Sequence, residues 1–230
     1  MNNIVFPFIL SPTSHNLKGL YPTSQEIKDV FSKANETEQC GIIRLWITEG
    51  VPFAFKEEPL LFEEVREFIA KGVGVHPKEV TLVGSGRIGY SLRKEVWGRV
   101  FSNSSDLDFT IISNELFSRL VKDFKKWVGD IESKKLKPTS ENQLNGWLGS
   151  IDVVDKNISK GYIYTKNLWS HQNYPTVQRS YGTMNKLKER LSHTKNAPRI
   201  SDMSIRVYSD WKSCIRQLQI NFKTALDIWS

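Results

Sequence analysis

Residues 82–112 read LVGSGRIGYSLRKEVWGRVFSNSSDLDFTII, and this stretch carries the strongest pattern in the chain. One apolar run ends at a Gly-Ser pair, Gly84 and Ser85, and two aspartates, Asp106 and Asp108, open a second apolar run. Because alternate side chains of a strand share one face, the two carboxylates are expected on the same side of the second strand. Like charges held side by side are costly unless a cation lies between them.

Two neighbouring carboxylates suit a hard divalent cation such as Mg²⁺ or Mn²⁺, which takes oxygen ligands. The glycines let the backbone approach a phosphate closely, and Ser85 at a helix start offers a hydroxyl and free backbone N–H groups. Arg87 either adds charge for phosphate or forms a structural ion pair. A metal on one side and hydrogen-bond donors for phosphate on the other predict a site for a nucleoside triphosphate. The alternative is that the aspartates cap a strand and the glycines form a plain turn.

Two other phosphate-binding motifs fit this stretch less well. The P-loop pattern ends in Gly-Lys-Ser/Thr, which is missing here. Gly84, Gly86 and Gly89 have the spacing of the dinucleotide-binding GxGxxG pattern, but the Asp-Leu-Asp further along the chain fits that pattern poorly. Both motifs are therefore set aside.

LVGSGRIGYS followed by SDLDFTII resembles the signature of the nucleotidyltransferase superfamily related to DNA polymerase β, over about 30 residues. The resemblance implies a small mixed sheet and transfer of a nucleotidyl group from an NTP. It also implies that Gly84 and Ser85 contact the triphosphate, while Asp106 and Asp108 hold the metals.

Active members of that superfamily carry a third carboxylate on a later strand, which helps to hold the catalytic metal and activates the acceptor hydroxyl. The candidates here are Asp152 and Asp155 in SIDVVD. Asp152 is preferred because IDVV reads like an acid on a β-run, and it completes the expected catalytic set with the two aspartates. If the third strand is instead GYIYT (161–165), that position holds no acid and Tyr164 occupies it.

The interval between the Gly-Ser pair and the acidic pair is longer than is usual for the superfamily. The extra residues LRKEVWGRV (92–100) are expected to form a loop or a longer helix near the site. That position would bring Arg93, Lys94 and Arg99 within reach of phosphates.

Hydrophobic periodicity places these motifs in a mostly helical chain. The predicted helices are 23–35, 38–48, 59–71, 114–129, one near 177–192, and 202–226. The predicted strands are 79–83, 107–112 and 161–165, and residues 141–165 read either as a helix or as containing a strand at 151–154.

These elements predict an α+β fold, with a small mixed β-sheet nucleotidyltransferase core flanked by N-terminal helices and a helical C-terminal half. The expected organisation is an N-terminal helical segment packed on the core (1–74), a nucleotidyltransferase-like core (75–168) and a C-terminal helical region (169–230).

The composition indicates in which cellular compartment the protein is expected. No apolar run among the 230 residues approaches the roughly 20 needed to cross a bilayer. The opening MNNIVFPFIL lacks a basic n-region and reads as a poor signal peptide. Cys40 and Cys214 have no metal-type spacing, which suggests free thiols in a reducing compartment. We therefore expect a cytoplasmic protein without a membrane partner.

Positive charge is concentrated in the second half of the chain. Residues 1–112 carry 12 Lys and Arg against 14 Asp and Glu, whereas residues 113–230 carry 20 against 11. Such a basic half suggests a polyanionic partner such as RNA, tRNA or DNA, the alternative being a solvated basic surface.

The resemblance and the charge together predict a Mg²⁺-dependent nucleotidyltransferase. The expected acceptor is RNA, tRNA or a partner protein, and stand-alone proteins of this fold also serve in toxin–antitoxin and phage-defence systems. The alternative is a catalytically weakened protein of the same fold that binds nucleotide, nucleic acid or a partner protein.

Overall fold

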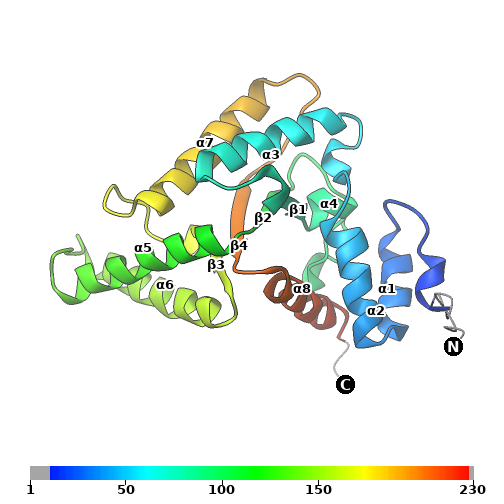
Figure 1. The fold of residues 1–230 in the computed structure, drawn as a ribbon, viewed down its shortest axis with the longest axis horizontal. Coiled ribbons are helices and arrows are strands. Elements are labelled where there is room, and N and C mark those ends of the chain that lie inside the picture. Colours follow the sequence, from blue (N-terminus) through cyan, green and yellow to red (C-terminus); the bar gives the residue numbers. More distant parts are fainter. Residues whose placement is uncertain (1–10, 228–230) are drawn as a thin grey trace, which may run out of the picture.

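The computed structural model describes residues 11–227, so the opening segment considered as a signal peptide lies outside the described residues. Helices surround one small central sheet (Figure 1). The α-helices are α1 (Ser24–Lys33), α2 (Glu36–Ile42), α3 (Pro59–Val73), α4 (Ser85–Ile88), α5 (Asn114–Glu132), α6 (Glu141–Ser159), α7 (Pro175–His193) and α8 (Trp211–Leu226). Between residues 11 and 227, no helix is both long and apolar enough to cross a membrane.

The sheet has four strands in the order β1-β2-β4-β3. Strand β1 (Val80–Val83) pairs antiparallel with β2 (Leu107–Ile112), β2 pairs parallel with β4 (Met203–Tyr208), and β4 pairs antiparallel with β3 (Tyr162–Tyr164). A small mixed sheet flanked by helices confirms the predicted α+β class.

Strand β4 corrects the prediction of one long helix over 202–226. Its apolar residues alternate with polar ones, so Met203, Ile205 and Val207 share one buried face. Ile205 and Tyr208 fit a helical spacing equally well, and pairing with β2 decides between the two periods. The segment predicted as a C-terminal helical region therefore supplies a central strand before α8 begins.

The prediction of a possible strand at 151–154 is also wrong, because α6 includes these residues without a break. Its two buried residues, Trp147 and Val154, lie seven positions apart, which is two helical turns. Ser140 caps the helix by accepting a hydrogen bond from the backbone N–H of Gln143. The predicted helix at 38–48 is divided into α2 and a π-helical turn, η2 (Ile43–Thr48).

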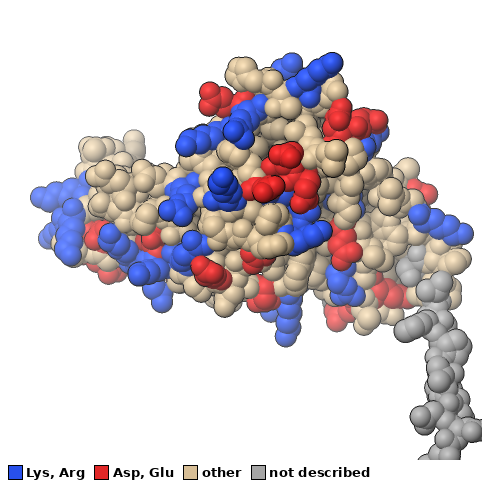
Figure 2. Space-filling model, turned by 45° about the horizontal axis from the view of Figure 1, so that its top comes forward, with Lys and Arg blue, Asp and Glu red and all other residues tan. Residues whose placement is uncertain are grey.

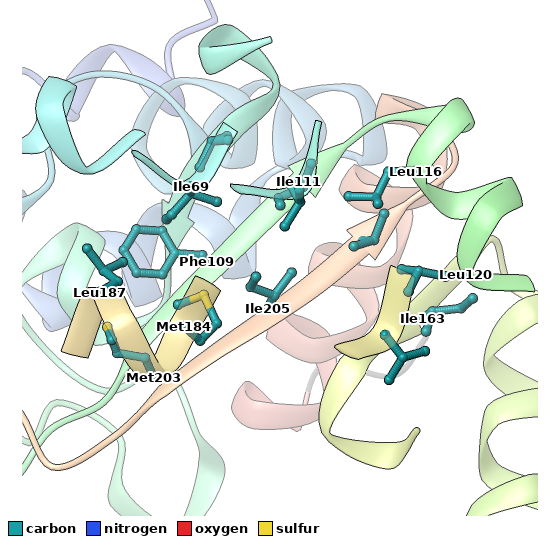
Figure 3. Packing of buried hydrophobic residues seen from close by; sticks show 14 of the residues in the cluster. Ile69, Phe109, Ile111, Leu116, Leu120, Ile163, Met184, Leu187, Met203 and Ile205 are labelled. Carbon is teal, nitrogen blue, oxygen red and sulfur yellow. The ribbon is translucent and has the colours of Figure 1, made fainter. Parts of the chain in front are cut away.

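The two faces of the sheet pack against different helices. Odd-numbered residues such as Phe109, Ile111 and Ile205 are fully buried on the face covered by α3, α5 and α7. Figure 3 shows these side chains gathered with residues of the three helices: Ile69, Leu116, Leu120, Met184 and Leu187.

On the opposite face, α8 and the N-terminal helices cover only part of the sheet. Ile112 and Tyr208 are buried there in a second hydrophobic cluster with residues of α1, α2, η2 and α8. Asp106, just before β2, and Asp108, within it, lie beyond this cluster and are accessible from the surface.

Helices α3 and α7 pack closely enough to require a glycine. A Cβ atom added at Gly72 of α3 would lie 2.5 Å from the Cγ2 of Thr183 on α7. By contrast, a Cβ added at Gly146 of α6 would meet nothing within 4 Å. The two glycines thus have opposite structural roles within helices.

We therefore expect Gly72→Ala to destabilise the protein by about 1–3 kcal/mol, because the added methyl overpacks this contact. Gly146→Ala should instead stabilise it by up to about 1 kcal/mol, because alanine favours the helix. Chemical denaturation of both variants measures the free energy of unfolding, and an equal effect at the two positions would contradict the observed packing.

Candidate functional site

One end of the sheet brings the predicted acidic pair next to residues from the other three strands. Val83 at the end of β1 pairs with Asp108, and Asp108 pairs with Ser204 near the start of β4. Tyr164 at the end of β3 pairs with Arg206. A cavity of about 510 Å³ opens over this end. Its walls include Gly84, Ser85, Ser91, Arg93, Lys94, Glu95, Arg99, Asp106, Asp108, Tyr164, Arg206, Leu218, Asn221 and Phe222.

Serine hydroxyls hold both carboxylates in place. Ser201 donates a hydrogen bond to Oδ1 of Asp106, and Ser204 donates one to Oδ1 of Asp108 at 2.7 Å. Within residues 11–227, no hydrogen bond reaches Oδ2 of either carboxylate. Because the hydroxyls fix one oxygen and leave the other, the pair fits the oxygen ligands that Mg²⁺ or Mn²⁺ prefers.

The turn after β1 needs its glycine. Gly84 has a φ of 68° and a ψ of −151°, a region that is essentially restricted to glycine. A Cβ atom at this position would also lie 3.3 Å from Oδ2 of Asp108. The turn therefore brings the backbone against the acidic pair and places Ser85 in the cavity wall. The helix that follows is a single turn of four residues, shorter than expected.

The structure does not bring Arg87 into the cavity, which corrects its predicted role in holding phosphate. Its side chain is 3 % exposed and donates hydrogen bonds to the backbone carbonyls of Val51, at 3.1 Å, and Glu49. Burial lowers the pKa of this guanidinium from its ordinary value. Arg87 thus connects the turn after β1 to residues 49–51, and its structural role rests on backbone carbonyls instead of the ion pair expected as the alternative.

Asp152 does not join the acidic pair either. It lies on the exposed side of α6 and forms an ion pair with Lys156 at 2.7 Å, one helical turn away. Neither Asp152 nor Asp155 lines the cavity. The run IDVV belongs to α6, so neither acid of this segment lies on a strand.

The sequence patterns did not indicate Asp202, the acid that directly precedes β4. It precedes Met203, which pairs with Leu107, and the backbone N–H of Leu107 donates to its carbonyl at 3.0 Å. Asp202 therefore stands beside Asp106 at the same end of the sheet.

The carboxylate of Asp202 is already engaged by two lysines. It forms ion pairs with Lys166 at 2.5 Å and with Lys188 at 3.7 Å, and the hydrogen bond from Lys166 lowers its pKa. In the described part of the chain, no group of three or more Asp, Glu, His or Cys side chains is arranged to hold a metal ion. The alternation in MSIRVY was the signal that could have placed β4, and Asp202, beside the pair.

The extra residues between the two motifs form a wall of the cavity, as expected. We call residues 91–99 the strap. Its ends meet through a β-bridge between Tyr90 and Val100, and Trp97 packs on Phe222 of α8 with ring centroids 5.9 Å apart. The three predicted cations of the strap line the cavity, where Lys94 is paired with Asp227 at 2.6 Å.

Comparisons with known proteins do not assign the chain to a family. No protein-family model, no curated protein and no solved structure matches it. The resemblance to the nucleotidyltransferase superfamily therefore rests on the sequence motif of residues 82–112.

We expect Arg87→Met to lower the free energy of unfolding by about 2–3 kcal/mol, because it leaves two carbonyls without a charged donor. Ligand affinity, measured well below the melting temperature, should not change. The matched control is Arg93→Met, an exposed cavity residue that should leave stability within about 0.5 kcal/mol of the wild type. Unchanged stability of Arg87→Met would restore the alternative that Arg87 serves a ligand.

Proposed function

We propose that the protein is a Mg²⁺-dependent nucleotidyltransferase that transfers a nucleotidyl group from an NTP to an acceptor. One observation carries this proposal: Asp106 and Asp108 share a cavity with the Gly84–Ser85 turn, which comes from a neighbouring strand. An acidic pair and a phosphate-binding turn facing one another are what this reaction requires.

Each group in the cavity then has a chemical task. The Oδ2 atoms of Asp106 and Asp108 would hold Mg²⁺ or Mn²⁺. When bound, such an ion neutralises the charge of the phosphates during in-line displacement. The hydroxyl and backbone N–H of Ser85 would bind the outer phosphates of the NTP, and the hydroxyls of Ser201 and Ser204 would keep the carboxylates oriented. The acceptor would attack the α-phosphate and release pyrophosphate.

Charge supports a polyanionic acceptor. Figure 2 shows Lys and Arg side chains gathered at the end of the molecule where α5 and α6 meet, and Lys134, Lys135 and Lys137 are exposed in that connection. Such a surface attracts phosphate backbones without reading sequence. This charge favours a nucleic acid as the acceptor, either RNA such as tRNA or DNA. A partner protein is the other acceptor class. A toxin–antitoxin or phage-defence setting is compatible with both.

A second candidate function is nucleotide binding without transfer. It is favoured by the ion pairs that engage Asp202, and by Ser204 and Arg206, which stand beside the acidic pair on β4 where a third acid would be needed. A protein with this site would still bind nucleotide, nucleic acid or a partner protein.

The first experiment is thermal unfolding with each NTP, with and without Mg²⁺. A ligand present at about 100 times its Kd adds about 2.7 kcal/mol to the stability of the folded state. We expect a Mg²⁺-dependent stabilisation of the wild type that disappears in Asp106→Ala/Asp108→Ala. Asp152→Ala is the matched control and should behave like the wild type. Equal stabilisation of the double variant would exclude the acidic pair as the metal site.

Asp202→Asn separates the two candidate functions. If Asp202 leaves Lys166 and activates the acceptor, the variant should lose about 10²–10⁴-fold in NTP turnover while retaining nucleotide-dependent stabilisation. Release of pyrophosphate reports turnover. A wild type that binds nucleotide but releases no pyrophosphate with any acceptor tested would favour the binding function instead.

A further inference from the structure

Arg206 is the cation of the sheet surface that faces the cavity. It lies on β4, two positions after Ser204, on the same face as Asp108 and between Thr110 of β2 and Tyr164 of β3. Its guanidinium lies 5.3 Å from the ring centroid of Tyr164 and 5.7 Å from that of Tyr162. The two rings therefore fix the position of a charged group in the floor of the cavity.

In the described part of the chain this charge forms no ion pair, although the carboxylate of Asp108 acts on it through space. No carboxylate lies within 4 Å of the guanidinium, and its Nε is buried without a hydrogen-bond partner. Asp108 takes its hydrogen bond from Ser204 instead. Because arginine does not lose its proton in proteins, the charge persists, and the tyrosine faces compensate it only in part. A half-buried cation of this kind is available to an anion in the cavity.

The strap adds two more such cations. Arg93 and Arg99 line the same cavity, and within residues 11–227 neither forms an ion pair. Glu95 is the one acid that the strap contributes to the lining. The cavity therefore has an acidic part around Asp106 and Asp108, and basic groups on its floor and on the strap.

We propose that Arg206 is an anion subsite that takes the phosphate chain of a nucleoside polyphosphate, with Arg93 and Arg99 as secondary contacts. The nucleoside part of this assignment rests on the proposed function. The anion subsite itself rests on Arg206 and requires neither a metal nor the acidic pair. Several cations spread over one cavity suit a condensed phosphate better than a single phosphate.

The test uses inorganic tripolyphosphate as the probe, in EDTA at one fixed ionic strength, with the full chain and isothermal titration calorimetry. Asp106→Asn/Asp108→Asn should bind the probe at least as tightly as the wild type, since two negative charges are removed. Adding Arg206→Met to that background should weaken binding at least tenfold. Orthophosphate should bind more weakly than tripolyphosphate to every variant that keeps Arg206.

Lys134→Met on the same background is the matched control, because it removes one positive charge outside the cavity. It should change binding less than twofold, and an equally small effect of Arg206→Met would overturn the proposal. If Arg206→Met does not fold, Arg206→Lys keeps the charge without the planar fork. That variant should weaken binding about three- to tenfold, and unaltered affinity would overturn the proposal in its place.

The result is independent of the proposed function. Tripolyphosphate binding that depends on Arg206, without Mg²⁺-dependent stabilisation by any NTP, would support the subsite and reject the nucleotidyltransferase. Mg²⁺-dependent stabilisation by NTP without an effect of Arg206→Met would do the reverse.

Discussion

The parallel pairing of β2 with β4 is the interaction on which the site depends. The two strands are more than 90 residues apart in the chain, and the segment between them must pass through α5, α6, β3 and α7 before β4 returns beside β2. Their register sets Ser204 against Asp108 and Asp202 beside Asp106. Without it, the acidic pair would have neither its hydroxyl donors nor a neighbouring cation.

That register also separates charge along the floor of the cavity. The carboxylates of Asp106 and Asp108 accept hydrogen bonds from neutral hydroxyls, while Lys166 and Lys188 form ion pairs with Asp202. Arg206 is held between aromatic rings instead of forming an ion pair with Asp108. Opposite charges thus lie near one another without a direct ion pair between them.

Local pattern predicted the elements that depend on local interactions. The strand at 107–112 was placed at its observed bounds, and most helices were found because their apolar residues recur at a clear period of 3.6. The positions of Gly84, Ser85, Asp106 and Asp108 in one cavity followed from the strand-turn-helix pattern.

The parts of the site that come from distant segments could not be read in the same way. Strand β4 has six residues, and Ile205 and Tyr208 match a helical period that continues into α8, so only its partner strands reveal it. The side chain of Arg87 follows a turn that was correctly predicted, but its hydrogen-bond acceptors lie more than 35 residues earlier. Asp152 was misplaced because the short segment IDVV, with three apolar residues, fits a strand and a helix equally well.

The bond between Arg87 and the carbonyls of Glu49 and Val51 has a consequence for how the chain can be divided. A fragment cut at 75–168, the boundaries suggested by sequence, would retain the whole motif but leave this buried guanidinium without its acceptors. It would also uncover Ile88 and lack β4 altogether. The motif of residues 82–112 is therefore not an independent unit, because segments that precede it and segments that follow it in the chain both maintain its shape.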